Sequence, residues 1–519
     1  MKKRTAARSM AALMGAAMVL TACGGGNTTA PTTGASSGGE TQTASESAES
    51  GKITKTDIVV GQASDIVTLD PAGQQDTTSG VLMKHAYSTL LDVDNEGKVV
   101  PDLAESYEMK SDTEYVFKLR EDACFWDGTP VTAQDVKFSL DRAKGMPKTK
   151  SNTSKIEEVT VNGDHEVTIK LTEPYAAFKT IVTQHNLSIL SEKAVTEAGD
   201  SYGDVDNLLG SGPFKVTEWV PNDHYTLVRN DNYWGEMPIA TSITCRVIPE
   251  GSARTIALEA GEIDVVWSVD PTDCANVESN PDVKLLSQPS TGIDYVGMNT
   301  QKEKFSDKRV RQAINYALDK QAFVDTIIEG RGLVANSYIN AAIPGWTDEV
   351  EAYPYDPEKA KELLAEAGYP DGFECSIFVN GDLRTRSAQI LQAQLADVGI
   401  KVDISTYEWG ALLDTLNAGE HEMFLLGWSN TSFDPDGSTY QLFYSGNHGA
   451  TGNRAFFSND KVDELILSAQ RESEESKRME LYKELQFVLH EESPWCPLYY
   501  KENNVGVRAD LKGFTLHAG

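Results

Sequence analysis

A cysteine near the N-terminus has the setting that most clearly predicts chemistry in this sequence. Cys23 follows an apolar segment, residues 11–20, which is preceded by the basic residues Lys2, Lys3 and Arg4. A basic start, an apolar core and small residues before a cut are typical of a secretory signal peptide. We therefore expect an exported, extracytoplasmic chain.

The residues around this cysteine also indicate how the chain is processed. Leu20-Thr21-Ala22-Cys23 resembles the bacterial lipobox, in which the acylated cysteine becomes the mature N-terminus. The resemblance implies a lipoprotein signal peptide over 1–22 and an acylated Cys23 that anchors the chain to the cell membrane; the alternative is ordinary secretory cleavage beside a chance cysteine. Residues 23–51 are rich in Gly, Ser and Thr, which predicts a flexible linker. No later apolar run approaches the roughly 20 residues that span a bilayer.

Composition limits the classes of partner and of reaction. The net charge of −32 repels phosphate backbones, so we expect no nucleic-acid partner. The sequence has no HExxH zinc motif and no phosphate-binding P-loop, and it predicts no metal site, no cofactor and no catalytic residue. The other cysteines lack metal spacing and are expected to be small buried residues, with one disulfide left open: Cys124, Cys245, Cys274, Cys375 and Cys496.

The elements that must position any site alternate between strands and helices, which suggests α/β or α+β lobes. A capping box at Thr132 predicts a helix start, and Asp356-Pro357 predicts another. Further helices are expected over 82–91, 387–398, 460–471 and 474–490. Strands are expected over 58–61, 115–120, 167–171, 263–267, 292–299, 400–404 and 495–500. Gly210-Ser211-Gly212 is interpreted as a tight turn before a strand pair.

Three segments together resemble one family. Phe125 to Val136, Gly210 to Phe214 and Asp307 to Asp319 are similar to the family 5 solute-binding proteins of ABC importers, a group with dipeptide-, oligopeptide-, glutathione- and nickel-binding members. The resemblance covers about Asp57 to Phe514. It implies an α/β periplasmic-binding-protein type II fold, with two main lobes around a ligand cleft plus an extra third lobe.

The resemblance also implies how the chain divides. Lobe I takes 52–94, 210–294 and 494–519, lobe II takes 95–209, and lobe III takes 295–493. Strands near 295–299 and 494–498 cross between lobes I and III, and closure about them buries the ligand.

Two stretches, Tyr407 to Gly410 and Gly427 to Asp436, resemble the part of peptide-binding members that lines the ligand site. Trp409 and Trp428 are implied to be walls of the cleft, because an indole offers a rigid apolar face; the alternative is plain core aromatics. Asn430, Thr431 and Asp434 are candidate ligand contacts beside them.

One position departs from the family. Thr431 stands where peptide binders usually have an Asp for the ligand's ammonium. Either Asp434 or Asp436 takes over the ammonium, or the ligand has no free amino terminus there; we favour the second interpretation, because Asp-Pro-Asp also suits a turn.

For a ligand carboxylate, Arg384 and Arg386 lie in the right neighbourhood but out of register, and Arg454 is another candidate clamp, since its fork suits bidentate pairing. A surface or lobe salt bridge is the alternative for Arg454.

The leading hypothesis is a lipid-anchored monomer that captures a peptide or peptide-like solute and delivers it to the transmembrane subunits of an ABC permease. Two alternatives stay open: a surface-tethered hydrolase with a carboxylate pair, and a receptor subunit that passes a ligand signal to a membrane sensor.

Overall fold

The computed structural model describes residues 55–95 and 97–516. Cys23, the signal peptide and the linker lie outside the described residues. Within the described ranges no helix combines the length and the apolar character needed to cross a membrane. The five cysteines of these ranges are all unpaired; four are buried and Cys124 is half-buried.

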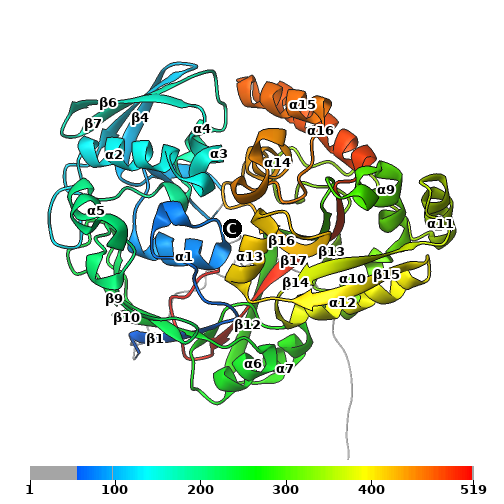
Figure 1. The fold of residues 1–519 in the computed structure, drawn as a ribbon. Helices are drawn as coiled ribbons and strands as arrows, with labels where there is room; N and C mark the ends of the chain where they lie inside the picture. The colour runs from blue at the N-terminus through cyan, green and yellow to red at the C-terminus, as the bar shows by residue number, and fades with distance from the viewer. Residues whose placement is uncertain (1–54, 96, 517–519) are drawn as a thin grey trace, which may run out of the picture. The chain divides into compact units, whose positions relative to one another are not determined.

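An eleven-stranded mixed sheet runs through the structure (Figure 1). Its order is β15-β14-β16-β12-β17-β11-β1-β10-β9-β8, and β13 pairs with β17 beside this path. The bounds are β1 Asp57–Gln62, β8 Phe214–Val220, β9 His224–Arg229, β10 Ser242–Val247, β11 Val265–Val266, β12 Val283–Met298, β13 Gly332–Val334, β14 Phe373–Val379, β15 Ile400–Thr406, β16 Met423–Ser429 and β17 Trp495–Arg508.

Two long strands join the halves of this sheet. β12 and β17 pair antiparallel from Val283–Arg508 to Gly297–Trp495, and the register shifts between Pro289 and Ile293 and again between Asp294 and Tyr295. On one side of the first shift β17 pairs with β11, and on the other side β12 pairs with β16. The predicted strands 292–299 and 495–500 are therefore parts of longer strands that continue into both halves.

Helices cover the β14–β16 half of the sheet on two sides and bury most of the apolar side chains there. Val310, Ile314, Leu364 and Leu391 pack against sheet residues such as Ile377. The helices of this half are α8 Glu303–Ser306, α9 Lys308–Ala317, α10 Lys320–Thr326, α11 Pro357–Glu366, α12 Gly381–Ala396, α13 Trp409–Asn417, α14 Asp436–Phe443, α15 Asp460–Arg471 and α16 Glu475–Glu492. The other half of the sheet carries α1 Thr77–Ala86, α6 Gly251–Glu259 and α7 Cys274–Ser279.

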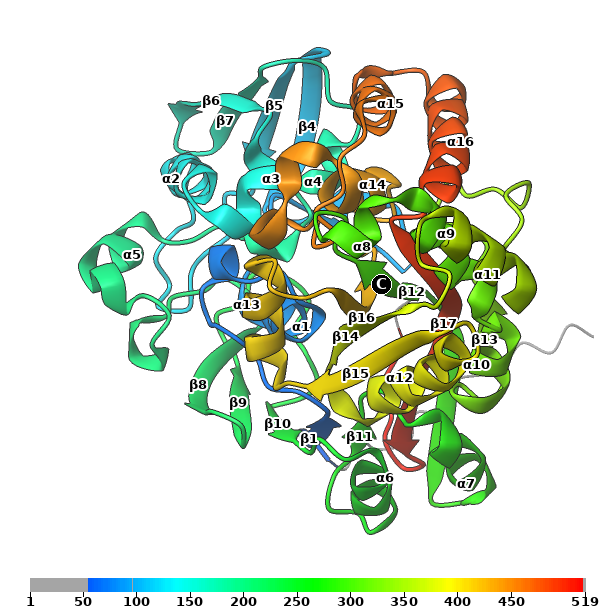
Figure 2. The same cartoon turned by 45° about the vertical axis from the view of Figure 1, so that its right-hand side comes forward.

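A separate four-stranded sheet, β4-β5-β7-β6, has its own apolar core built around Phe117 and Phe178. Figures 1 and 2 show α2 beside this sheet, apart from the large one. The elements here are β4 Ala104–Ser111, β5 Glu114–Leu119, α2 Ala133–Lys144, α3 Lys150–Thr153, β6 Ile156–Gly163, β7 Glu166–Leu171, α4 Phe178–Ile181 and α5 Glu192–Ala198. A short pair, β2 Leu91–Val93 and β3 Val99–Pro101, precedes it.

Most of the predicted elements are present, and the boundaries of two predicted helices were wrong by several residues. The capping box of α2 forms between Thr132 and Asp135, and Asp356 caps α11. Residues 82–91 do not form one helix: α1 begins after its N-cap Asp76 and ends at Ala86, and Leu91 starts a strand. Likewise α12 begins at Gly381, six residues before the predicted start.

The Gly-Ser-Gly turn has a structural role, as predicted. A Cβ on Gly210 would lie 2.0 Å from the carbonyl oxygen of Ala86, and one on Gly212 would lie 2.6 Å from that of His85. The turn packs directly on the end of α1, where only glycine leaves enough room.

Candidate functional site

Two adjoining cavities lie between segments that are far apart in the sequence. The smaller, of about 370 Å³, is lined by the start of α1, the end of β16, residues 183–186, Trp409 and Arg454. The larger, of about 670 Å³, lies over β1, β10 and β11 and is lined by residues of the C-terminal segment. The cavities adjoin along eight shared lining residues: Thr77, Val81, His85, Trp267, Trp409, Gly427, Ser429 and Phe514.

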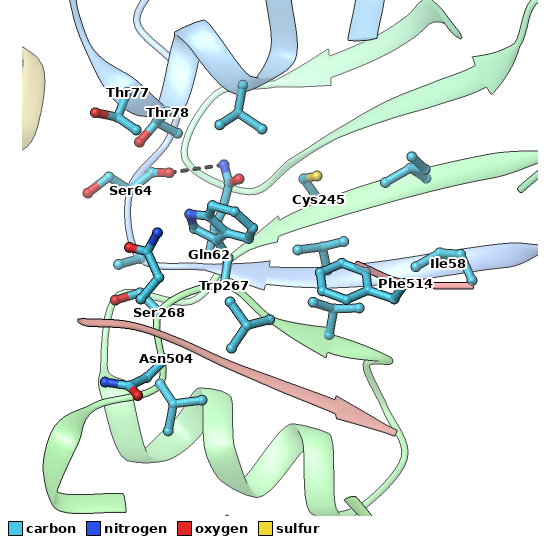
Figure 3. Close-up of a pocket in the computed structure, with 18 of the residues that line it drawn as sticks. Ile58, Gln62, Ser64, Thr77, Thr78, Cys245, Trp267, Ser268, Asn504 and Phe514 are labelled. Atoms are coloured by element: carbon cyan, nitrogen blue, oxygen red, sulfur yellow. Dashed lines mark hydrogen bonds between the residues drawn. The ribbon is translucent and has the colours of Figure 1, made fainter. Parts of the chain in front are cut away.

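The larger cavity is mostly apolar where the strands form its wall. Figure 3 shows Ile58, Trp267 and Phe514 around it, with Ser64, Thr77 and Thr78 at one end. Gln62 Nε2 donates a hydrogen bond to the carbonyl oxygen of Ser64 at 3.0 Å, which occupies one of the amide's two N–H groups. Such a mixture of apolar walls and few polar groups is typical of a small-molecule site.

The structure brings the two predicted tryptophans to the smaller cavity. Trp409 is the first residue of α13, is half-buried and lines both cavities; no hydrogen-bond partner for its indole Nε1 occurs among the described residues. Trp428 donates from Nε1 to the carbonyl oxygen of Gly437 at 3.1 Å and packs on the cluster of Ile293, Ala335 and Tyr500. Trp428 therefore belongs to both the cavity wall and the apolar core.

Asn430 and Thr431 also line the smaller cavity, but their side chains bind protein groups. Asn430 Nδ2 donates to the carbonyl oxygen of Asp434 and to Ser438 Oγ, both at 2.7 Å, and its Oδ1 accepts from Ser432. Thr431 Oγ1 donates to Gln184 Oε1 at 3.3 Å. Asn430 thus holds the turn that carries Thr431.

The candidates for a replacement ammonium site do not line either cavity, which corrects the expectation for Asp434. Both Asp434 oxygens accept from Arg478, at 2.5 and 2.8 Å, in a buried ion pair. Asp436 accepts from Tyr175 OH at 2.5 Å and from Gln470 Nε2 at 2.9 Å. Burial, with the neighbouring Asp434 charge, raises the pKa of Asp436 to about 6. The Asp-Pro-Asp element is a structural turn.

The three predicted arginines lie in different surroundings. Arg454 is 5% exposed and lines the smaller cavity; its Nε donates to Asn417 Oδ1 at 3.0 Å, and burial lowers its pKa. Arg384 lines the larger cavity, donates to Asn380 and stands 3.7 Å from Asp294.

Arg386 pairs with Asp270 at 2.6 Å and lines neither cavity. Of the three, Arg454 has a guanidinium that faces the smaller cavity without an ion-pair partner among the described residues.

Sequence reasoning missed Asp76, which lines the smaller cavity. Its Oδ1 accepts from the Ser79 N–H at 2.9 Å as the N-cap of α1, whereas Oδ2 is shielded and has no partner among the described residues. The sequence signal was Asp76-Thr77-Thr78-Ser79, a typical helix start. The sequence does not point to Asp76 when the helix is expected to begin at residue 82, five residues after the observed start.

The segments on the two sides of the smaller cavity are bonded to each other beyond it. Gln441 Nε2 donates to Asn152 Oδ1 at 2.6 Å, and Ser154 Oγ lies 3.0 Å from Tyr440 OH. The Ala176 N–H donates to the carbonyl oxygen of Gln470 at 2.7 Å. With the Tyr175–Asp436 bond, these contacts join the four-stranded sheet's segment to α14 and α15 and enclose the space between them.

Comparison with known proteins gives consistent matches. The family model described as "Bacterial extracellular solute-binding proteins, family 5 Middle" matches residues 98–450. The glutathione-binding protein GsiB of Escherichia coli (strain K12) is 32% identical over 479 residues, which are 89% of this chain and 92% of GsiB.

Two solved structures extend the match to three dimensions. The periplasmic binding protein DppA of Helicobacter pylori, in complex with the peptide STSA, superposes with a TM-score of 0.85 at 29% identity, covering 88% of this chain and 95% of DppA. AgaA of A. tumefacien R10, in complex with agropinic acid, gives 0.84 at 27% identity, with 88% and 94% covered. The structure therefore has the type II periplasmic-binding-protein fold of its neighbours.

Proposed function

Because the chain belongs to the bacterial extracellular solute-binding proteins of family 5, we propose that it captures a peptide or peptide-like solute and delivers it to the transmembrane subunits of an ABC permease. The supporting observation is the cavity of about 370 Å³, whose walls come from α1, β16, α13 and residues 183–186. A cavity lined by segments so distant in sequence suits a protein that closes on its ligand by moving whole lobes.

The lobes proposed from the sequence suit this function. Lobe II, residues 95–209, contains the four-stranded sheet with its own core. Lobe I, from 52–94, 210–294 and 494–519, and lobe III, 295–493, share the large sheet through β12 and β17. We place the hinge at the register shift between Pro289 and Ile293, because interrupted pairing there makes bending easier than in a regular ladder.

The contacts beyond the cavity support a closed state of the protein. Tyr175, Gln184 and Asn152 of lobe II bond to Asp436, Thr431 and Gln441 of lobe III. In the proposed cycle these contacts form when the ligand is bound and break when it leaves, so the ligand shifts the population toward the closed form. The closed surface is then what the permease engages.

The proposed place of action is the outer face of the cell membrane. The lipobox and the linker 23–51 support a lipid on Cys23 and a body that reaches away from the bilayer. The relatives are solute-binding proteins, so transport is proposed rather than catalysis.

The test combines binding with a measurement of closure. The mature chain, freed of ligand, is mixed with random peptides of two to five residues and with glutathione, and native mass spectrometry identifies retained species. A retained ligand at a hundredfold excess over Kd should stabilise the protein by about 2.7 kcal/mol. It should also reduce the radius of gyration in small-angle scattering. Retention of no peptide, or identical scattering with a saturating ligand, would refute the proposal.

A further inference from the structure

Some charged side chains that line the smaller cavity have no ion-pair partner among the described residues. Asp92 pairs with Lys84 at 3.1 Å, and the His85 ring bonds the Val81 carbonyl oxygen while burial lowers its pKa. Asp76 and Arg454 each line the cavity without an ion pair to any described residue within 4 Å. One anion and one cation are thus left facing the same space.

The unused atoms of these two side chains are the ones that a ligand can reach. Helix capping occupies Asp76 Oδ1 and leaves Oδ2 without a partner. Arg454 Nε donates a hydrogen bond to Asn417 Oδ1, whereas the two terminal nitrogens of Arg454 make no hydrogen bond to a described residue. Leaving a shielded carboxylate oxygen unpaired is costly, and the cost is recovered when a ligand donates to it.

The charges of Asp76 and Arg454 interact through space without a direct ion pair. Asp76 raises the pKa of Arg454 through space, after the dominant effects of burial and Tyr295, yet the two form no direct pair. Burial raises the pKa of Asp76, and this effect outweighs Ser79, the more distant Lys148 charge and the neighbouring Trp409 indole, which all lower that pKa. A cation directly beside Asp76 would therefore favour its charged form. The tryptophan Trp409 stands at the same cavity, as a flat wall for the apolar part of a ligand.

We propose that Asp76 Oδ2 binds the ammonium group of a zwitterionic ligand, whose carboxylate binds the terminal nitrogens of Arg454. This assigns the ammonium to α1 rather than to the turn at 430–438, where Thr431 bonds Gln184 and Asp434 bonds Arg478. The ligand class is then a short peptide or amino-acid derivative with a free amino group, which replaces the expectation of a blocked amino terminus. This inference rests on the proposed function.

The experiment uses the mature chain and three versions of one library of peptides of two to five residues: unmodified, N-acetylated and C-amidated. Native mass spectrometry selects binders, and calorimetry measures them. Wild-type protein should lose roughly 30-fold or more in affinity on acetylation, and amidation should also weaken binding. Asp76→Asn should weaken unmodified peptides by a similar factor and abolish the preference over acetylated ones.

The variant is chosen so that the fold survives. Asparagine caps helices about as well as aspartate, so Asp76→Asn keeps the bond to Ser79 while it removes the charge. Asp356→Asn, at the N-cap of α11 and outside both cavities, is the matched control and should bind as the wild type does.

Three outcomes would overturn the assignment. Equal binding of free and acetylated peptides by the wild type would show that no ammonium is bound. An undiminished acetylation penalty in Asp76→Asn would place the ammonium elsewhere. Binding of no peptide from any library would refute the proposed function as well, which separates that failure from the first two.

Discussion

Replacing Asp434 by alanine tests whether this carboxylate holds the fold or the ligand. Asp434 is 8% exposed and Arg478 is 7% exposed, and the two form a bidentate pair. Asp434→Ala leaves the guanidinium buried without its anion, which typically costs about 3 to 5 kcal/mol. The Asp436 N–H also loses its acceptor at 2.9 Å, worth about 1 kcal/mol. We expect a loss near the upper end of this range.

The assay is urea unfolding followed by tryptophan fluorescence, with ligand affinity measured beside it by calorimetry. Stability should fall while affinity for the tightest library peptide stays within about threefold, because Asp434 does not line a cavity. The double variant Asp434→Leu with Arg478→Met should recover most of the stability, since a packed apolar pair often replaces a buried ion pair at little cost.

Two results would refute this reasoning. An affinity loss of tenfold or more with an unchanged urea midpoint would return Asp434 to the ligand site. Absence of recovery in the double variant would show that shape rather than charge explains the loss.

Three further predictions follow from the structure. Trp409→Ala should weaken peptide binding at least about tenfold by calorimetry. It should lower the ligand-free melting temperature less than Trp428→Ala does, because Trp428 packs on two core clusters and donates a hydrogen bond to Gly437, whereas Trp409 packs on one and its indole Nε1 has no partner among the described residues; unchanged affinity in Trp409→Ala would remove it from the site. Cys23→Ser should move the protein from membrane to soluble or unprocessed fractions, and continued membrane retention would contradict the lipid anchor. Burial lowers the pKa of His421 to about 4, so the unfolded chain binds its proton more readily and stability falls from pH 7 to pH 5 by about 2 kcal/mol; unfolding curves of His421→Gln should lack that part of the loss.

Local sequence signals predicted the elements that local chemistry determines. Thr132 with Asp135 and Asp356 with Pro357 begin helices through contacts within one turn, so both starts were visible in the sequence. The start of α12 was not, because Gly381 is a poor helix former and the helix begins there only in the context of its sheet. The strands β12 and β17 were recognised only where their apolar runs are unbroken.

The residues of the candidate site also divide into those that the sequence indicated and those that it could not indicate. The resemblance singled out Trp409, Trp428 and Thr431, which all line the smaller cavity, because a family motif carries its position in the fold with it. Arg454, which lines the same cavity, was proposed from the chemistry of its side chain. The sequence alone could not show that Asp434 has a neutralising ion-pair partner and that Asp76 has none. Whether a carboxylate is neutralised depends on a partner such as Arg478, 44 residues away, and on which oxygen a helix cap consumes.

The position of β17 has a consequence for the order in which the molecule can form. This strand lies in the middle of the large sheet, between β12 and β11, yet it follows every other strand of that sheet along the described chain. The sheet has no continuous hydrogen-bonded path until residues 495–508 are available, so an emerging chain cannot complete its native topology. Its long-range pairings also make folding slow. Truncation before Trp495 would therefore divide the sheet in two.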